Sequence, residues 1–123
     1  MTARVDIRRK RAYDEPEPSD GYRVLIDRLW PRGVSKARAK LDEWDRDLAP
    51  SAELRAWFGH DPSRFEEFRA RYLSELRGHR PRLAALRRRA REGRLTLVYT
   101  AHDTEHNDAV VLEAVLRRGL PRT

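Results

Sequence analysis

The chain has 123 residues, a formal net charge of +7 and 39% hydrophobic residues, and it contains no cysteine. Its length suits one domain with a single modest core, and its hydrophobic content excludes a chain that is disordered by composition. The lack of cysteine excludes disulfides, thiolate metal ligands and thiol catalysis. No stretch approaches the ~20 apolar residues of a membrane span, and the basic N-terminal segment has no apolar stretch behind it. We therefore expect one cytoplasmic domain of bacterial type over residues 1–123, with no membrane segment and no cofactor.

The first half of the chain predicts short strands separated by loops. Residues 4–9 alternate apolar and polar side chains, which is the period of a half-exposed strand. Residues 15–21 contain two prolines and an Asp-Gly pair, which indicate a loop. Residues 22–30 contain a continuous apolar run, typical of a strand that is covered on both faces. A short helix over residues 35–41 and a short strand over residues 41–44 follow.

The second half predicts helices around one further strand. Ser51 and Asp61 precede amphipathic segments and are suited to cap helices. Residues 95–100, LTLVYT, form the clearest strand pattern in the sequence. Helices are expected over residues 51–58, from Asp61 to about residue 77, over residues 81–92 and over residues 109–118.

This alternation of helices and short buried strands predicts a single layered α/β domain with a mainly parallel sheet flanked by helices. The direction of the first strand stays open. Ligands of open parallel sheets bind at the carboxyl ends of the strands. Two predicted strands end in polar segments, RLWPRG at residues 28–33 and AHDTEHN at residues 101–107. If these strands are parallel, both segments lie at the same edge of the sheet.

The residue types in these segments favour a small anionic ligand. Arg28 and Arg32 are suited to bind a carboxylate or phosphate through their guanidinium groups, and Trp30 offers an apolar wall. Backbone N–H groups near Asn107 would add positive potential, and His60 lies where it can reach the same edge. We therefore predict ligand binding by Arg28, Trp30, Arg32, His60 and Asn107. The alternatives are that Arg28 pairs with an acid and that Trp30 packs at the rim of the core.

His106 and Asp103 are the candidates for catalysis. A histidine exchanges protons near neutral pH, and a neighbouring carboxylate can orient its ring. Acid–base or hydrolytic chemistry would follow, but no complete set of nucleophile, base and orienting group can be read from the sequence, so the enzyme question stays open. Asp103, Thr104, Asn107 and Asp108 are equally suited to cap the last helix. No metal is expected, because no third ligand joins the histidines of this bend.

Non-enzymatic nucleic-acid binding or regulation is the alternative function. Seven arginines lie between Arg80 and Arg94, and the net positive charge fits a polyanionic partner. We favour this less, because no recognisable element for reading nucleic acid is present. A third alternative is an interaction protein whose polar loops bind a partner chain.

Three segments resemble one known family. They are DGYRVLIDRLWPRGVSK, LDEWDRDLAPSAELRAWFGHDPSRFEEFRARYLSEL and LTLVYTAHDTEHNDAVVL. In this order they closely resemble the YeaO-like branch of domain of unknown function 488, over about residues 8–116. Other branches are similar at the last strand but carry two cysteines, where this chain has Tyr99 and Asn107, while Asp103 is kept. The resemblance implies no established reaction.

Overall fold

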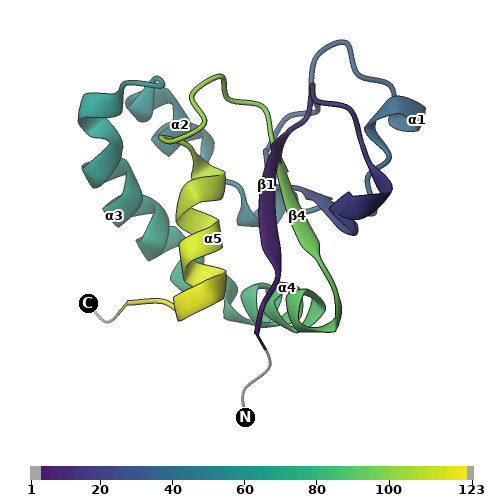
Figure 1. Ribbon diagram of the computed structural model, residues 1–123. Coiled ribbons are helices and arrows are strands. Elements are labelled where there is room, and N and C mark those ends of the chain that lie inside the picture. Colours follow the sequence, from purple (N-terminus) through teal and green to yellow (C-terminus); the bar gives the residue numbers. More distant parts are fainter. Residues whose placement is uncertain (1–3, 122–123) are drawn as a thin grey trace.

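The computed structural model describes residues 4–121. Four parallel strands form one sheet in the order β1-β4-β2-β3 (Figure 1). The strands are β1 (Ile7–Arg11), β2 (Tyr22–Leu25), β3 (Glu43–Trp44) and β4 (Leu95–Tyr99). Leu95 of β4 is in register with Ile7 on one side and Tyr22 on the other. The predicted α/β fold is confirmed, and the first strand is parallel to the others.

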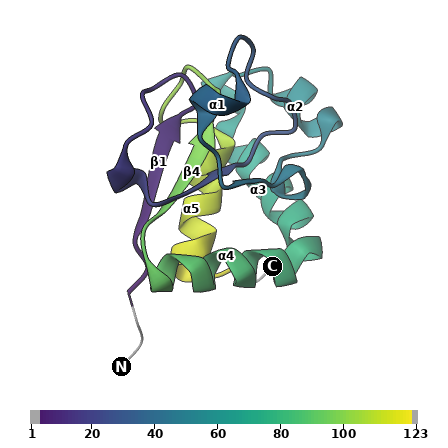
Figure 2. The same ribbon diagram turned by 90° about the vertical axis from the view of Figure 1, so that its right-hand side faces the viewer.

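Helices cover one face of this sheet more fully than the other. The helices are α1 (Lys36–Ala39), α2 (Ala52–Phe58), α3 (Phe65–Leu76), α4 (Arg80–Glu92) and α5 (Asp108–Arg118). Figure 1 shows α2, α3 and α5 on the same side of the strands. Figure 2 shows α4 running across the lower end of the sheet and α1 in front of the other face. The carboxyl ends of the strands are thus at the edge opposite α4.

The larger core lies between the sheet and α2, α3 and α5. Phe58 and Phe68 stack with ring centroids 4.3 Å apart, and the fully buried Tyr72 donates its hydroxyl to the Leu48 carbonyl. On the opposite face, Ala12, Leu25 and Val98 form a smaller core, and the partly buried Trp30, Leu41 and Trp44 pack against it. Among residues 4–121, no helix is long and apolar enough to cross a membrane.

The predicted helix caps at Ser51 and Asp61 are present. Ser51 Oγ accepts from the Leu54 backbone N–H at 3.2 Å and so begins α2. Asp61 Oδ1 accepts from the Ser63 N–H at 3.0 Å and begins a 3-10 turn that leads into α3. Of the four candidates for the last cap, Asn107 takes the position, because its Oδ1 accepts from the Val110 N–H at 3.0 Å.

The strand predicted over residues 22–30 is shorter in the structure. The Ile26 N–H still donates to the Val98 carbonyl at 3.1 Å. On the neighbouring strand, the N–H of Thr100, just after β4, donates to the Asp27 side chain and not to a backbone carbonyl. The backbone ladder therefore ends at this point. The first strand also begins later than residue 4, since pairing with β4 starts at Ile7.

Gly21 precedes β2 where the chain passes close to residue 94. Its φ is +66°, and a Cβ placed there would lie 2.3 Å from the Arg94 carbonyl oxygen. Gly33 has a similar φ of +78° with open space around it. A side chain at Gly33 would therefore meet only the cost of a positive φ, whereas a side chain at Gly21 would also clash with the backbone of Arg94.

We predict that Gly21→Ala destabilises the protein more than Gly33→Ala. The Gly33 variant should lose roughly 1–2 kcal/mol, the cost of a positive φ in a residue with a Cβ. The Gly21 variant has the clash in addition, because the Arg94 carbonyl also accepts the Tyr22 N–H and cannot move freely. Urea unfolding measures both, and equal losses would contradict the close approach of the two backbone segments.

Candidate functional site

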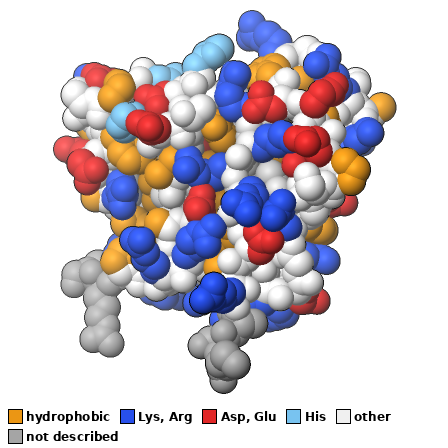
Figure 3. All heavy atoms as spheres, viewed as in Figure 1, with side chains coloured by type: hydrophobic (Ala, Val, Ile, Leu, Met, Phe, Trp, Pro, Cys, Tyr) orange, Lys and Arg blue, Asp and Glu red, His pale blue; other side chains and the backbone are white. Residues whose placement is uncertain are grey.

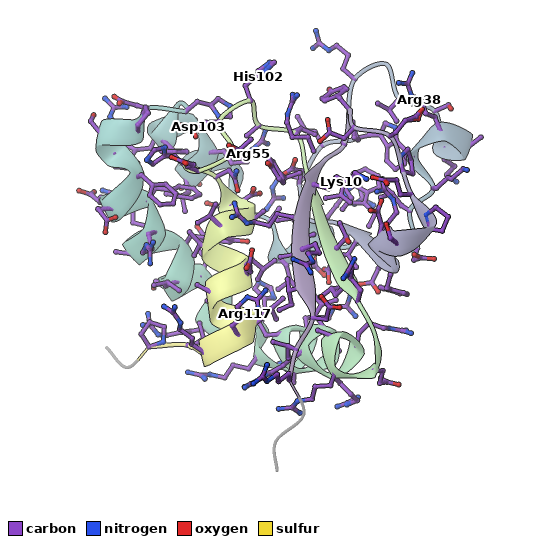
Figure 4. The ribbon with its side chains drawn as sticks, in the orientation of Figure 1. Lys10, Arg38, Arg55, His102, Asp103 and Arg117 are labelled. Carbon is purple, nitrogen blue, oxygen red and sulfur yellow. The ribbon has the colours of Figure 1, made fainter. Side chains whose placement is uncertain are left out.

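A pocket of about 330 Å³ opens at the carboxyl edge of the sheet. Its polar lining comes from the exits of β2 and β4, from α2 and from the start of α5, and consists of Asp27, Arg55, His60, Thr100, Asn107 and Asp108. Its apolar lining consists of Pro50, Ala52, Ala56, Phe58, Phe68 and Ala101. Figure 4 shows Arg55 at this upper edge, below the loop that carries His102 and Asp103. The volume is at the lower end of the roughly 300–1,000 Å³ of small-molecule pockets.

Asp27 joins the exits of the two central strands. Its Oδ2 accepts two hydrogen bonds from Thr100, one from the backbone N–H at 2.8 Å and one from Oγ1 at 2.7 Å. Its backbone carbonyl accepts from the Trp44 indole N–H at 2.7 Å. Thr100 thus fixes the carboxylate of Asp27 at the pocket wall, and Trp44 fixes its backbone.

Asp108 is the first residue of α5 and is only 9% exposed. Its Oδ1 accepts from the Ala109 N–H at 2.9 Å. Burial raises the pKa of Asp108 well above its ordinary value, and the negative charge of Asp27 and a hydrogen bond between the two carboxyls raise it further. The nearby positive charge of Arg55 opposes the rise in pKa. We therefore predict that the two carboxyls form a pair that holds one proton between them.

Positive charge comes from α2 and the residues after it. Arg55 is exposed and, within residues 4–121, its guanidinium forms no hydrogen bond or ion pair. His60 is also exposed, has a φ of +57° and lies with its ring centroid 6.2 Å from that of Phe58. Both side chains line the pocket, so the positive charge of Arg55 and the carboxyls of Asp27 and Asp108 lie in one lining.

Of the predicted ligand-binding residues, His60 and Asn107 line this pocket and three others do not. Arg28 is exposed, with its Nε 3.5 Å from the Pro50 carbonyl, and has no ion pair with Asp27 among the described residues. Trp30 packs edge-on against Trp44 with centroids 5.3 Å apart and donates to the Val34 carbonyl. Arg32 is exposed and lies outside the pocket lining.

The two candidates for catalysis contact each other. His106 Nδ1 lies 2.9 Å from Asp103 Oδ2, and its ring meets Phe65 edge-on with centroids 5.2 Å apart. Asp103 Oδ1 also accepts the N–H groups of Glu105 and His106, and these hydrogen bonds lower the pKa of Asp103. Neither His106 nor Asp103 lines the pocket. Their contacts hold the bend together, and their catalytic roles stay a prediction.

Four pocket residues lay outside the sequence prediction: Asp27, Arg55, Thr100 and Asp108. Asp27 follows three apolar residues and falls inside the strand predicted over residues 22–30. A charged residue directly after a buried apolar run is the signal that could have shown that the strand ends there. Arg55 reads as a solvent-facing position of α2. No sequence signal distinguishes it from the other arginines, because its distinction is its place beside the pocket.

Some basic side chains form ion pairs with acidic side chains, and others do not. On the face shown in Figure 3, acidic and basic side chains are interleaved. Arg9 and Arg117 both pair with Glu113, at 2.7 and 2.8 Å. On the predicted basic surface, Arg82 pairs with Glu43 and Asp45, and Arg94 pairs with Asp6. Arg80, Arg87, Arg88 and Arg91 form no ion pair within the described part of the chain.

Side chains able to hold a metal ion do not cluster in the described residues. No group of three or more histidine, aspartate, glutamate or cysteine side chains has the geometry of a metal site there. His102 is exposed at the top of the bend, and His106 faces Phe65.

Comparison with known proteins places the chain in a family. The model of the inactive DUF488-N3 subclade matches residues 6–123. The chain is 46% identical to the uncharacterised protein YeaO of Escherichia coli (strain K12), over 92% of this chain and 98% of that protein. It is 39% identical to an uncharacterised protein of Mycobacterium tuberculosis (strain ATCC 25618 / H37Rv), over 94% and 98% of the two chains. No solved structure matches the chain significantly.

The raised pKa of Asp108 predicts how Asp108→Asn changes the pH dependence of stability. Above the ordinary carboxyl pKa of 3.8, the unfolded state releases a proton that the native state still binds, so stability falls as pH rises. Asparagine does not titrate, so the Asp108→Asn variant does not lose stability in this way. The free energy of unfolding of Asp108→Asn minus that of the wild type should therefore increase as pH rises above about 4.

Asp103→Asn is the matched control, because the pKa of Asp103 is lowered and the sign is opposite. Asp103 stabilises above its unfolded pKa, and this contribution is lost as pH falls. The difference between Asp103→Asn and the wild type should therefore change only in acid. Urea unfolding between pH 3 and pH 8 measures both variants. A constant difference for Asp108→Asn across this range would contradict the shared proton.

Proposed function

This chain belongs to the inactive N3 subclade of the DUF488 family, and we propose that it binds a small anionic molecule in the pocket at the carboxyl edge of the sheet, without turning it over. The proposal assigns the contact with the anion to Arg55 and His60. Asn107 and Thr100 supply further polar contacts at the same wall. The description of the subclade as inactive supports binding without catalysis.

The unpaired guanidinium of Arg55 carries this proposal. An arginine without an acidic partner beside a pocket offers its full set of donors to a carboxylate or phosphate, often through two parallel hydrogen bonds. Within residues 4–121 no side chain occupies those donors. The apolar walls made by Phe58, Phe68 and Ala101 exclude water around part of the ligand, which strengthens such a contact.

Catalysis by His106 and Asp103 has no comparable support from their position, since neither lines the pocket. The roles predicted for Arg28, Trp30 and Arg32 likewise stay predictions. They would apply to a ligand that extends beyond the pocket along the loop after β2. Our proposal needs only the residues that line the pocket.

A second candidate function is nucleic-acid binding on the opposite edge. Arg80, Arg87, Arg88 and Arg91 line a hollow of about 340 Å³ between α4 and the end of α5, and they have no acidic partner within residues 4–121. The Nε of Arg87 is buried there without a hydrogen-bond partner among the described residues. Arginines in this arrangement favour phosphate groups, which accept hydrogen bonds and carry negative charge.

Arg55→Ala tests the pocket. An anion that binds only the folded state at 100 times its dissociation constant stabilises it by about 2.7 kcal/mol, which a thermal shift detects easily. We expect at least one of acetate, butanoate, phosphate and sulfate to raise the melting temperature of the wild type but not of Arg55→Ala. Arg32→Ala, an exposed arginine outside the pocket lining, is the matched control and should respond like the wild type. A shift that survives in Arg55→Ala would disprove the assignment.

The second candidate predicts salt-dependent affinity for DNA or RNA that depends on α4. Reversing Arg87, Arg88 and Arg91 to glutamate should abolish binding. Any binding that remains should depend less on salt, because the slope of log affinity against log salt concentration falls by about one for each phosphate that is no longer neutralised. Reversal of Lys36, Arg38 and Lys40 on and beside α1 changes the net charge equally and is the control. An equal loss of affinity in both triple variants, measured by fluorescence anisotropy, would show that only net charge matters.

A further inference from the structure

The interior of the pocket carries a negative group that an anion alone would not use. Asp27 and Asp108 both line the cavity, and the charge of Asp27 and its hydrogen bond with Asp108 are among the causes that raise the pKa of Asp108. Thr100 occupies Asp27 Oδ2 and the Ala109 N–H occupies Asp108 Oδ1, which orients the two carboxyls. A carboxyl pair with one shared proton keeps one negative charge, and it accepts hydrogen bonds from a donor in the cavity.

Opposite charges therefore lie on separate parts of one small cavity. Arg55 is on α2, and Asp27 and Asp108 are at the exit of β2 and the start of α5. Arg55 and Asp108 line the same cavity without an ion pair, and the positive charge of Arg55 opposes the rise in the pKa of Asp108. Ala52 and Ala56 of α2, with Phe58 and Phe68, give the cavity apolar walls. A ligand that fills it meets a cation, an apolar surface and an anion.

We propose that the pocket binds a small zwitterion, a molecule whose carboxylate pairs with Arg55 and whose primary ammonium group sits on the Asp27–Asp108 pair. This inference rests on the proposed function and adds the second half of the ligand. An ammonium group has three donors and no acceptor, which suits two carboxyls that have only acceptors to offer once their shared proton is gone. A carboxylate suits the guanidinium fork of Arg55.

Binding of the ammonium group displaces the shared proton. The pair releases that proton to water and becomes doubly negative, while the ammonium group supplies one positive charge in its place. A ligand with a carboxylate but no amine leaves the proton where it is. Release of a proton on binding therefore distinguishes the two kinds of ligand.

Every charged or titratable group that faces the pair enters this linkage. Arg55 faces it from α2, and its positive charge opposes protonation of Asp108. His60 lines the same cavity from the residues that follow α2. Tyr72 faces it from α3, and burial and the two carboxyls raise the pKa of its hydroxyl well above its usual range, so it stays neutral. The affinity for a zwitterion should increase with pH, because the pair is then less protonated before the ligand arrives.

The test compares 4-aminobutanoate with butanoate by titration calorimetry in two buffers of different ionisation enthalpy. We expect the wild type to bind the amino acid at least about tenfold more tightly, as one charge-assisted contact allows, with release of roughly one proton. Glycine and 6-aminohexanoate vary the distance between the two charges. Phosphate is titrated in parallel as an anion without an amine.

Three variants separate the two ends of the ligand. Asp27→Asn should reduce the affinity for 4-aminobutanoate to that for butanoate, and Arg55→Ala should abolish binding of both. Asp108→Asn leaves the Asp27 carboxylate in place, so it should keep affinity but lose proton release. This last result keeps the test informative if Asp27→Asn fails to fold without the two Thr100 hydrogen bonds.

The outcomes distinguish the inference from the proposed function. If none of the three amino acids binds more tightly than butanoate and no proton is released, the zwitterion is excluded while anion binding at Arg55 stands. If the amino acids, butanoate and phosphate all fail to bind, both fail. Proton release with the amino acid that disappears in Asp108→Asn would establish the inference.

Discussion

The contact between Asp27 and Thr100 determines where the pocket lies. In this sheet β4 is central, and β1 and β2 run parallel to it on either side. The Asp27 carboxylate accepts hydrogen bonds from the Thr100 N–H and hydroxyl. These side-chain hydrogen bonds replace the backbone hydrogen bonds of the sheet where β2 and β4 end. Both strands then diverge, one into the loop toward Trp30 and one into the bend before α5. The cavity lies beside this junction because the chain has separated there.

The same contact brings a second carboxyl to the first. The bend returns the chain so that Asn107 caps α5 and Asp108 is buried at its start. A buried carboxylate next to another is unfavourable unless one of them keeps a proton, and burial and Asp27 both raise the pKa of Asp108. This arrangement costs folding free energy near neutral pH. A pair of this kind suits a binding site better than the packing of a helix end, which is the physical basis of our proposals.

Most of the fold could be predicted from the sequence, because hydrophobic period and caps are local signals. Ser51 and Asp61 cap as expected, and the residues 95–100 predicted as a strand contain β4. The shared edge of the two polar exits was also predictable from parallel pairing. The composition of the pocket was not: Asp27 reads as the interior of a strand and Arg55 as a surface position, and only tertiary packing brings them together. The same holds for Arg82, whose acidic partners lie near residue 44.

Carbon-13 NMR of carboxyl-labelled aspartate, followed against pH, tests the central claim most directly. Resonances of the pair are assigned by their loss in Asp27→Asn and Asp108→Asn. If the two carboxyls share a proton inside the pocket, the Asp108 resonance titrates well above pH 4. That step is absent in Asp108→Asn and moves to lower pH in Asp27→Asn, where Asp108 stays buried but the neighbouring charge is gone. If the Asp108 resonance titrates near or below pH 4, the pair holds no shared proton and our account of the pocket is wrong.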